Sequence, residues 1–446
     1  RSYLMKVVGI IAEYNPFHKG HAYQIRYARS VLKADYIIVA TSGDFVQRGT
    51  PALMPKHVRA EMALKCGADL VLELPVSTAT ASAEAFAAGG VSLLSGLGVV
   101  DELCFGSECG NTKLLMGIAG ILANEPEAYR HILQQKLRSG MSFPAARSKA
   151  LVSYIETADI PPYSSISNAA AALSAQNGLV LSPEQAETIL SSPNNILGIE
   201  YCKAILRQNS QMIPHALLRE GRGYHDTNLE AVSNASSAQD ASAFPSASGI
   251  RKLFTLNPEA TDFSRFIPKA ALPVFLASLK DNAWLSEDAL DLPLHYKLLL
   301  ETEKTLHTYP ELSDALIRRI LKFRNQYEGF SQFADLLKTR DITRSAICRS
   351  LLHIFLDQKE KAPERIPYAR VLGFCKNSSS LLGQIKKSAS IPLLTKAADA
   401  PSVLDAEGYR LFRGTCESSN LYEMLLCHKT GHGFVHELKK SPRILL

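Results

Sequence analysis

The stretch VVGIIAEYNPFHKGHAYQI, residues 7–25, decides the fold of this chain. Four of its first five residues are Val or Ile, which is typical of a buried β-strand, and a helical apolar spacing begins at Tyr23. The polar loop between them carries two histidines, His18 and His21, with Gly20 between them. This order of strand, loop and helix predicts the first unit of a parallel α/β sheet.

Three later apolar runs repeat this pattern, and helical stretches separate them. They are YIIVATSG at 36–43, ADLVLELP at 68–75 and VVDELCFGSE at 99–108. Continuous apolar strands of this kind are typical of a parallel sheet with helices on both faces. Ligands of such sheets bind beyond the carboxyl ends of the strands, so we expect a site formed by the opening loop, residues 42–49 and residues 106–108.

The composition predicts a globular protein without membrane spans. Hydrophobic residues make up 46% of the 446 residues and charged residues 21%, and no run approaches the roughly 18 apolar residues that a membrane helix requires. The eight cysteines form no CxxC pair, which predicts reduced thiols and a cytoplasmic location, not disulfides or a zinc ribbon. The net charge of +6 permits a polyanionic partner without requiring one. We expect the natural chain to start at Met5.

The length predicts more than one domain. Residues 5–265 alternate between strands and helices, whereas helices with few strand-like runs follow from about residue 266. We therefore predict a catalytic α/β domain at 5–265 and a mainly helical domain at 266–446.

The loop that joins the first strand to its helix is suited to binding an anion, because free backbone N–H groups and the helix dipole attract phosphate there. The side chains of His18 and His21 would lie beside a triphosphate and stabilise the charge that develops as pyrophosphate leaves. Gly20 would let the backbone approach the nucleotide closely. The alternative is a polar turn in which two histidines occur by chance.

A second segment fits an ATP site. The stretch PSASGIRKLF at 245–254 offers the hydroxyls of Ser246 and Ser248 to phosphate oxygens, and Arg251 supplies a bidentate cation. Nucleotidyltransferases with an HxGH motif carry a late Ser/Thr-rich loop of this kind, which ends in a basic residue. Alone, the stretch would be interpreted as a Ser-rich linker.

Seven strings of this sequence resemble the bacterial tRNA(Met) cytidine acetate ligase family, and they occur in that family's order. They are GIIAEYNPFHKGH, SGDFVQRGTPALMPKHVRAEMAL, GADLVLELP, FGSE, SPNNILGIEYCKAI, GYHD and SGIRKLF. The resemblance runs from about Met5 into the C-terminal helices. It implies a Rossmann-like, parallel-sheet nucleotidyltransferase domain of the HxGH (HUP) type, followed by a mainly α-helical C-terminal domain that binds tRNA.

The activity that the resemblance implies is an ATP-dependent ligation. Acetate and ATP would form acetyl-adenylate and pyrophosphate, and the acetyl group would pass to N4 of the wobble cytidine of elongator tRNA(Met). ATP would be a substrate and Mg²⁺ would enter with it, since the sequence shows no dedicated carboxylate cage. Coenzyme A would not be needed, because no Q/RxxGxG/A pyrophosphate loop is evident.

The resemblance also implies which residues form the site. The catalytic residues would be His18, His21 and Arg251. The ATP-binding residues would be Ile11, Ala12, Glu13, Tyr14, Asn15, Pro16, Phe17, His18, Lys19, Gly20, His21, Ala22, Tyr23, Gln24, Gly106, Asn194, Asn195, Arg219, Ser246 and Ser248. Asn194 is preferred to Asn195 as the asparagine of SPNN. The family has asparagine where this chain has Lys19 and Asp44, so these two positions depart from its pattern.

The substrates other than ATP have less distinct signals. Acetate or the cytidine would contact Ser42, Asp44, Gln47 and Arg48, unless this stretch is a surface turn with a structural arginine. The residues proposed for tRNA are Arg344, Arg349, Lys386 and Lys387, and the alternative is that they lie on solvated helix faces.

The histidines near the C-terminus do not predict a metal site. Cys427, His428, His432 and His436 have suggestive spacing, but two glycines among them interrupt a regular helix.

Three other functions remain open. They are an adenylyltransferase that acts on a small cofactor precursor, a coenzyme-A-dependent acetyltransferase, and a non-catalytic RNA-binding protein with a vestigial nucleotide site.

Overall fold

The computed structural model describes residues 5–141, 143–157, 183–219, 246–256 and 261–446. The GYHD string, at 223–226, lies outside the described residues. Among those described, no helix is both long enough and apolar enough to cross a membrane.

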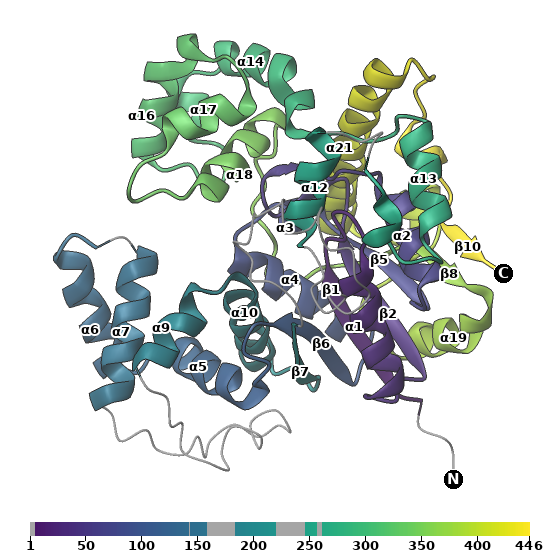
Figure 1. The fold of residues 1–446 in the computed structure, drawn as a ribbon, viewed down its shortest axis with the longest axis horizontal. Coiled ribbons are helices and arrows are strands. Elements are labelled where there is room, and N and C mark those ends of the chain that lie inside the picture. The colour runs from purple at the N-terminus through teal and green to yellow at the C-terminus, as the bar shows by residue number, and fades with distance from the viewer. Residues whose placement is uncertain (1–4, 142, 158–182, 220–245, 257–260) are drawn as a thin grey trace.

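A largely parallel sheet forms the centre of the molecule (Figure 1). Its strands are β1 (Val7–Ala12), β2 (Tyr36–Ser42), β5 (Leu70–Leu74), β6 (Glu102–Ser107), β7 (Ile213–Leu218), β8 (Ala369–Cys375), β9 (Leu393–Leu394) and β10 (Arg443–Leu445). The order is β10-β8-β5-β2-β1-β6-β7, and β9 pairs with β8. The strands β1, β2, β5, β6 and β7 are parallel, whereas β8 runs antiparallel to β5. The four strands predicted from the sequence are confirmed.

The sheet is covered on both faces because the side chains of β1 alternate between them. Val7 and Ile11 pack with α4, α5 and α10, while Val8 and Ile10 pack with α1, α2, α12 and α13. The helices of the first face are α4 (Ala83–Gly96), α5 (Thr112–Asn124) and α10 (Pro193–Arg207), and those of the second are α1 (Lys19–Ser30), α2 (Lys56–Lys65), α12 (Ala247–Leu256) and α13 (Leu272–Lys280). Both faces of β1 are therefore dry, which explains its continuous apolar sequence.

A helical lobe packs around a separate apolar cluster, to which α14, α16, α17 and α18 contribute together with residues of β3, α3 and α21 (Figure 1). Its helices are α14 (Asp291–Leu300), α15 (Glu303–Leu306), α16 (Asp314–Phe323), α17 (Phe330–Leu337) and α18 (Arg344–Phe355). The remaining elements are β3 (Phe45–Val46), β4 (Thr50–Pro51), α3 (Val76–Ala79), α6 (Glu127–Arg138), α7 (Phe143–Thr157), α9 (Pro183–Ser191), α19 (Ser379–Ser388), α20 (Ala400–Val403) and α21 (Ala406–Thr430).

The sheet does not end where the sequence predicts a domain boundary. Strands β8, β9 and β10 come from the range 266–446 and extend the sheet of the range 5–265. The second range is mainly helical, as predicted, but its last part belongs structurally to the α/β sheet.

Candidate active site

The two histidines of the opening loop form the start of α1. His18 is the N-cap residue, and its Nδ1 accepts a hydrogen bond from the backbone N–H of Gly20 at 3.0 Å. The Nδ1 of His21 accepts from the backbone N–H of His18 at 3.2 Å. The two rings stack with their centroids 3.8 Å apart. Because Nδ1 accepts in both rings, each neutral imidazole carries its proton on Nε2 and can donate it to a ligand.

Both imidazoles are neutral at physiological pH. Burial, together with the nearby Arg219 and Arg251, lowers the pKa of His18 to about 3. Burial also lowers the pKa of His21 well below its usual range, with contributions from His18 and Arg219. The neutral imidazoles can therefore offer hydrogen-bond donors to an anion, and Arg219 and Arg251 carry positive charge close to them.

Arg251 connects the late Ser-rich segment to the opening loop. From α12, its Nη1 donates to the carbonyl oxygen of Asn15 at 2.5 Å, and its Nη2 donates to Ser248 Oγ at 3.2 Å. Ser246 Oγ accepts from the backbone N–H of Gly249 at 3.2 Å, so it supports the first turn of α12. Burial and the proximity of Arg48 lower the pKa of Arg251 to about 10. The structure thus brings together two segments that are more than 200 residues apart.

Arg219 joins this group from the end of β7. Its backbone N–H donates to the carbonyl oxygen of Ser107 at 3.0 Å. A Cβ at Gly106 would lie 3.3 Å from the Cγ of Arg219, so the glycine leaves room for the arginine stem. Gly106 and Arg219 therefore lie side by side at the carboxyl ends of β6 and β7, where a parallel sheet binds its ligands.

The loop after β2 lies against the opening loop. The backbone N–H of Gln47 donates to Glu13 Oε1 at 2.6 Å, and that of Leu53 donates to Asn15 Oδ1 at 2.7 Å. Arg48 is half-buried, and burial lowers its pKa while Glu13 opposes that shift. The loop that carries Gln47 and Arg48 is thus bonded to the opening loop, and Arg48 lies near Arg251.

Asp44 and Ser42 are directed into the interior. Asp44 Oδ1 accepts from the backbone N–H of Lys56 at 2.8 Å, and its Oδ2 lies 3.7 Å from Lys56 Nζ. Ser42 is fully buried, and its Oγ has no hydrogen-bond partner among the described residues. The charge that Asp44 adds to the loop is therefore matched by a buried lysine.

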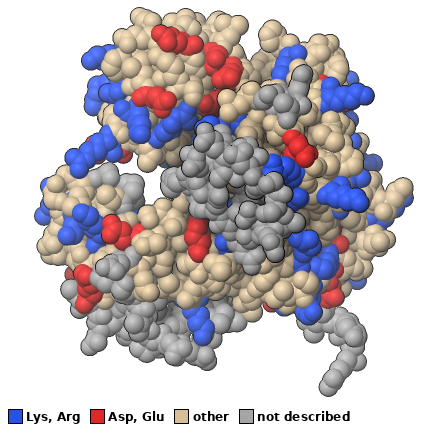
Figure 2. All heavy atoms as spheres, viewed as in Figure 1, with Lys and Arg blue, Asp and Glu red and all other residues tan. Residues whose placement is uncertain are grey.

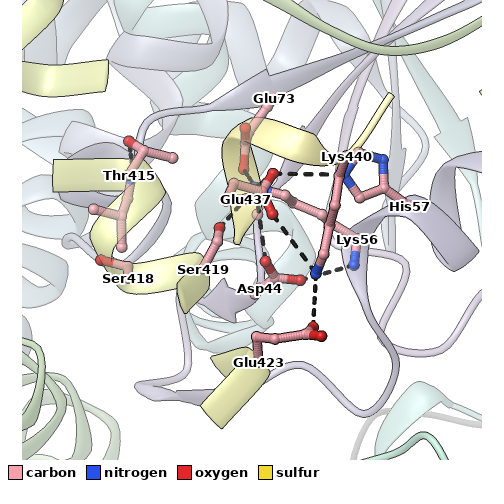
Figure 3. A network of polar contacts seen from close by, with 12 residues as sticks. Asp44, Lys56, His57, Glu73, Thr415, Ser418, Ser419, Glu423, Glu437 and Lys440 are labelled. Carbon is pink, nitrogen blue, oxygen red and sulfur yellow. Dashed lines mark hydrogen bonds and ion pairs between the residues drawn. The ribbon is translucent and has the colours of Figure 1, made fainter. Parts of the chain in front are cut away.

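Lys56 belongs to a buried network of charges (Figure 3). Its Nζ lies 2.6 Å from Glu73 Oε1 and 2.8 Å from Glu437 Oε1, and it donates to Ser419 Oγ at 2.7 Å. Arg370 pairs with the same two glutamates at 2.7 and 2.6 Å. The network joins α2 and β5 to α21 and to the short 3-10 helix η6 (Glu437–Lys439).

The asparagines of SPNN begin α10, and a glutamate holds them. Glu108 Oε1 accepts from Asn194 Nδ2 at 2.6 Å, and Glu108 Oε2 accepts from the backbone N–H of Asn195 at 2.8 Å. Asn195 is buried, and its Oδ1 accepts from Ser107 Oγ at 2.7 Å and from Cys109 N at 3.1 Å. Asn195 thus has a structural role, whereas Asn194 is half-buried. The sequence analysis includes Glu108 in the expected site at 106–108 but does not predict that its carboxylate holds the start of α10.

The four basic residues predicted to bind tRNA lie on two separate helices. Arg344 pairs with Glu287 and Asp335, and Arg349 pairs with Glu311. These two arginines are on α18 in the helical lobe, whereas the exposed Lys386 and Lys387 are on α19, at the lower right of Figure 1. Figure 2 shows Lys and Arg in several separate groups on this face, with Asp and Glu between some of them.

The described part of the chain contains no group of three or more His, Cys, Asp or Glu side chains that could hold a metal ion. His436 Nδ1 accepts from the backbone N–H of Leu438 at 3.2 Å, and its Nε2 lies 3.0 Å from Asn420 Nδ2. It therefore supports the start of η6.

Comparisons with known proteins agree with this geometry. A family model described as HIGH Nucleotidyl Transferase matches residues 5–433. A tRNA(Met) cytidine acetate ligase of Acetivibrio thermocellus is 35% identical over 438 residues, which cover 95% of this chain and 96% of the relative. An enzyme of the same name from Halothermothrix orenii is 36% identical over 402 residues, which cover 88% of this chain and 87% of the relative.

Solved structures of a related protein also match this chain, over nearly its whole length. Thermotoga maritima TmcAL bound with alpha-thio ATP has a TM-score of 0.82 and 28% identity, and the match covers 99% of this chain and 100% of that one. The apo form of the same protein has a TM-score of 0.85 with equal coverage. These matches confirm the α/β nucleotidyltransferase fold with a helical C-terminal region. This chain therefore belongs to the HIGH nucleotidyltransferase family and, within it, to the tRNA(Met) cytidine acetate ligases.

Proposed function

We propose that this chain activates acetate with ATP and transfers the acetyl group to N4 of the wobble cytidine of elongator tRNA(Met). The observation that carries the proposal is the stacked pair His18 and His21 at the start of α1, with Arg251 bonded to the carbonyl of Asn15. The relatives of 35% and 36% identity bear the name of this activity.

In the first step, a carboxylate oxygen of acetate forms a bond to the α-phosphorus of ATP. The bond from that phosphorus to the bridging oxygen breaks, and pyrophosphate leaves with the electron pair. His18 and His21 donate hydrogen bonds to phosphate oxygens from Nε2, and Arg251 offsets the repulsion between the two anions. ATP extends along residues 11–24 and reaches Gly106, Asn194, Arg219, Ser246 and Ser248.

In the second step, N4 of the cytidine attacks the acetyl carbonyl carbon. The bond between that carbon and the AMP oxygen breaks, AMP leaves, and the N4 proton passes to water or to the departing phosphate. No covalent enzyme intermediate is needed, so positioning and electrostatics supply the acceleration. Within this proposal Gln47 and Arg48 contact acetate or the cytidine, while Ser42 and Asp44 support their loop from inside.

The remaining parts of the proposal concern the partners. Mg²⁺ enters with ATP, and the site needs no coenzyme A. The range 266–446 binds tRNA, with Lys386, Lys387, Arg344 and Arg349 near its phosphates, and the enzyme works in the cytoplasm.

A direct assay tests the proposal. The protein is mixed with ATP, Mg²⁺, labelled acetate and individual tRNA transcripts, without coenzyme A. We expect label in elongator tRNA(Met), and none in a transcript whose wobble cytidine is replaced by uridine. Unlabelled RNA together with AMP attached to a small molecule would instead identify an adenylyltransferase. RNA binding without any consumption of ATP would identify a non-catalytic RNA-binding protein.

A further inference from the structure

Arg59, on α2, is a fully buried arginine that neither the sequence analysis nor the proposed mechanism uses. Its guanidinium donates only to backbone carbonyls: Nε to Met54 O at 2.9 Å, and Nη1 to Glu13 O at 2.6 Å and to Ser42 O at 3.1 Å. Nη2 donates to the carbonyl of Gly43. Among the described residues, no carboxylate lies within ion-pair distance of this side chain.

A buried guanidinium without a paired carboxylate is unusual, because removing a charge from water is costly unless it is compensated. Burial lowers the pKa of Arg59, and the more distant Asp44 opposes that shift. The compensation comes from four carbonyl dipoles that belong to three separate segments. A planar fork of donors can reach all of them at once, whereas the single ammonium of a lysine cannot.

These carbonyls lie in the two loops that form the candidate site. Glu13 follows β1 and precedes Asn15, whose carbonyl accepts from Arg251. Ser42 is the last residue of β2, and Gly43 begins the loop that carries Gln47 and Arg48. Two further hydrogen bonds cross the same junction, from the backbone N–H groups of residues 47 and 53 to the side chains of Glu13 and Asn15.

The helix that carries Arg59 is itself fixed. Lys56, at the start of α2, is held by Glu73, Glu437 and Ser419 (Figure 3). Arg59 therefore extends from a fixed helix toward two loops. The contacts of Lys56 help to set its position independently of those loops.

We propose that Arg59 is a positioning residue, which holds the loop that binds ATP and the loop that carries Gln47 and Arg48 in one fixed arrangement. This inference rests on the proposed function. The reaction joins two anions, so its rate depends on the distance between the α-phosphorus and the acetate oxygen. Arg59 contacts neither of them and sets that distance through the backbone.

The test compares Arg59→Lys with a matched variant, Arg319→Lys. Arg319 also donates to backbone carbonyls, of Leu337 and Leu336, but in the helical lobe. We measure acetate-dependent exchange of pyrophosphate into ATP, its kcat and KM values, and the melting temperature. For Arg59→Lys we expect kcat to fall by about 100-fold, the size of effect that a misplacement of about 1 Å produces, with KM changing less than kcat. Arg319→Lys should lower the melting temperature and leave kcat within twofold of the wild type.

Two results would overturn the inference: a kcat of Arg59→Lys within twofold of the wild type, or equal losses of kcat in both variants. Hydrogen exchange provides a second measurement, which also applies if Arg59→Lys does not fold. In the wild-type protein without ATP, the amides of Gln47 and Leu53 should exchange as slowly as those of β1. Fast exchange without ATP and protection only in its presence would show that ATP, not Arg59, assembles the two loops.

The same experiments separate this inference from the proposed function. A wild-type protein that shows no acetate-dependent exchange contradicts the proposed function. The amide exchange rates and ATP affinity measured by calorimetry then still decide whether Arg59 orders the loops.

Discussion

In the proposed mechanism, the side chains of His18 and His21 are neutral donors, not cations. Their Nδ1 atoms are occupied by the capping bonds of α1, and burial together with neighbouring arginines keeps their pKa values low. The helix start thus fixes the tautomer as well as the direction of each ring. The start of α1 and the proposed chemistry therefore depend on the same two hydrogen bonds, those from the backbone N–H groups of His18 and Gly20.

Replacing His21 tests its proposed role. In His21→Ala we expect kcat for adenylate formation to fall by about 10²–10³-fold, because one donor to the developing charge is lost. His21→Asn is the matched variant: its amide oxygen can replace the acceptor for the N–H of His18, but its side chain is shorter than an imidazole. Pyrophosphate exchange measures adenylate formation, and filter binding measures the affinity for tRNA, which neither variant should change. Exchange at the wild-type rate in either variant, or loss of tRNA affinity, would contradict this role.

The low pKa of His18 predicts a pH dependence of stability. The folded pKa is about 3 and that of an unfolded histidine is about 6.5, so below pH 6.5 the unfolded state binds a proton that the folded state does not. Stability therefore falls as the pH falls, by about 2 kcal/mol for this residue between pH 7 and pH 5. Urea unfolding at both pH values measures it. His18→Asn keeps an N-cap acceptor and should lose less stability between pH 7 and pH 5 than the wild type. An equal loss in both proteins would show that His18 does not cause this pH dependence.

At the scale of elements, the sequence predicts those strands and helices whose conformation depends only on the pattern of nearby residues. The strands β1, β2, β5 and β6 follow from apolar runs, and the start of α1 follows from the polar loop before it. Strand β8 cannot be predicted in this way, because its conformation depends on pairing with β5, about 300 residues earlier. The partners of Asp44 and Asn195, which are Lys56 and Ser107, likewise follow only from the fold, so the sequence alone does not predict how these two side chains are held.

The contact between the loop after β2 and helix α18 predicts the effect of a small substitution. Gly49 has a φ of +81°, and a Cβ there would lie 2.3 Å from backbone atoms of Cys348 and Arg349. We expect Gly49→Ala to lower the free energy of unfolding by about 1–3 kcal/mol or more, measured by denaturant titration.

The matched control is Gly383→Ala in α19, where nothing outside the neighbouring backbone of the helix itself lies within 4 Å of the added methyl group. This change should raise the helix propensity and the stability by up to about 1 kcal/mol. A stable Gly49→Ala protein would show that the loop can move away from α18.

At the scale of the whole molecule, the network around Lys56 joins segments that are far apart in the sequence. Arg370→Met would leave Glu73 and Glu437 buried with one cation fewer. Breaking a buried ion pair in this way costs about 3–5 kcal/mol, so the denaturation midpoint should fall sharply. Lys386→Met, on the exposed side of α19, should change the stability by less than about 0.5 kcal/mol. Similar midpoints for the two variants would show that the network contributes little to stability.

The same network has a consequence for synthesis on the ribosome. Residues 5–265 emerge first and contain Lys56 and Glu73, but Arg370 and Glu437, which complete the buried network, are translated much later. The nascent α/β portion would lack β8, α21 and η6, the elements that carry Arg370, Ser419 and Glu437, so its Lys56 and Glu73 would lack these partners. We therefore expect prematurely terminated chains to remain unfolded and open to proteolysis. A ribosome that stalls within the helical lobe would then leave behind no partial enzyme that consumes ATP without modifying RNA.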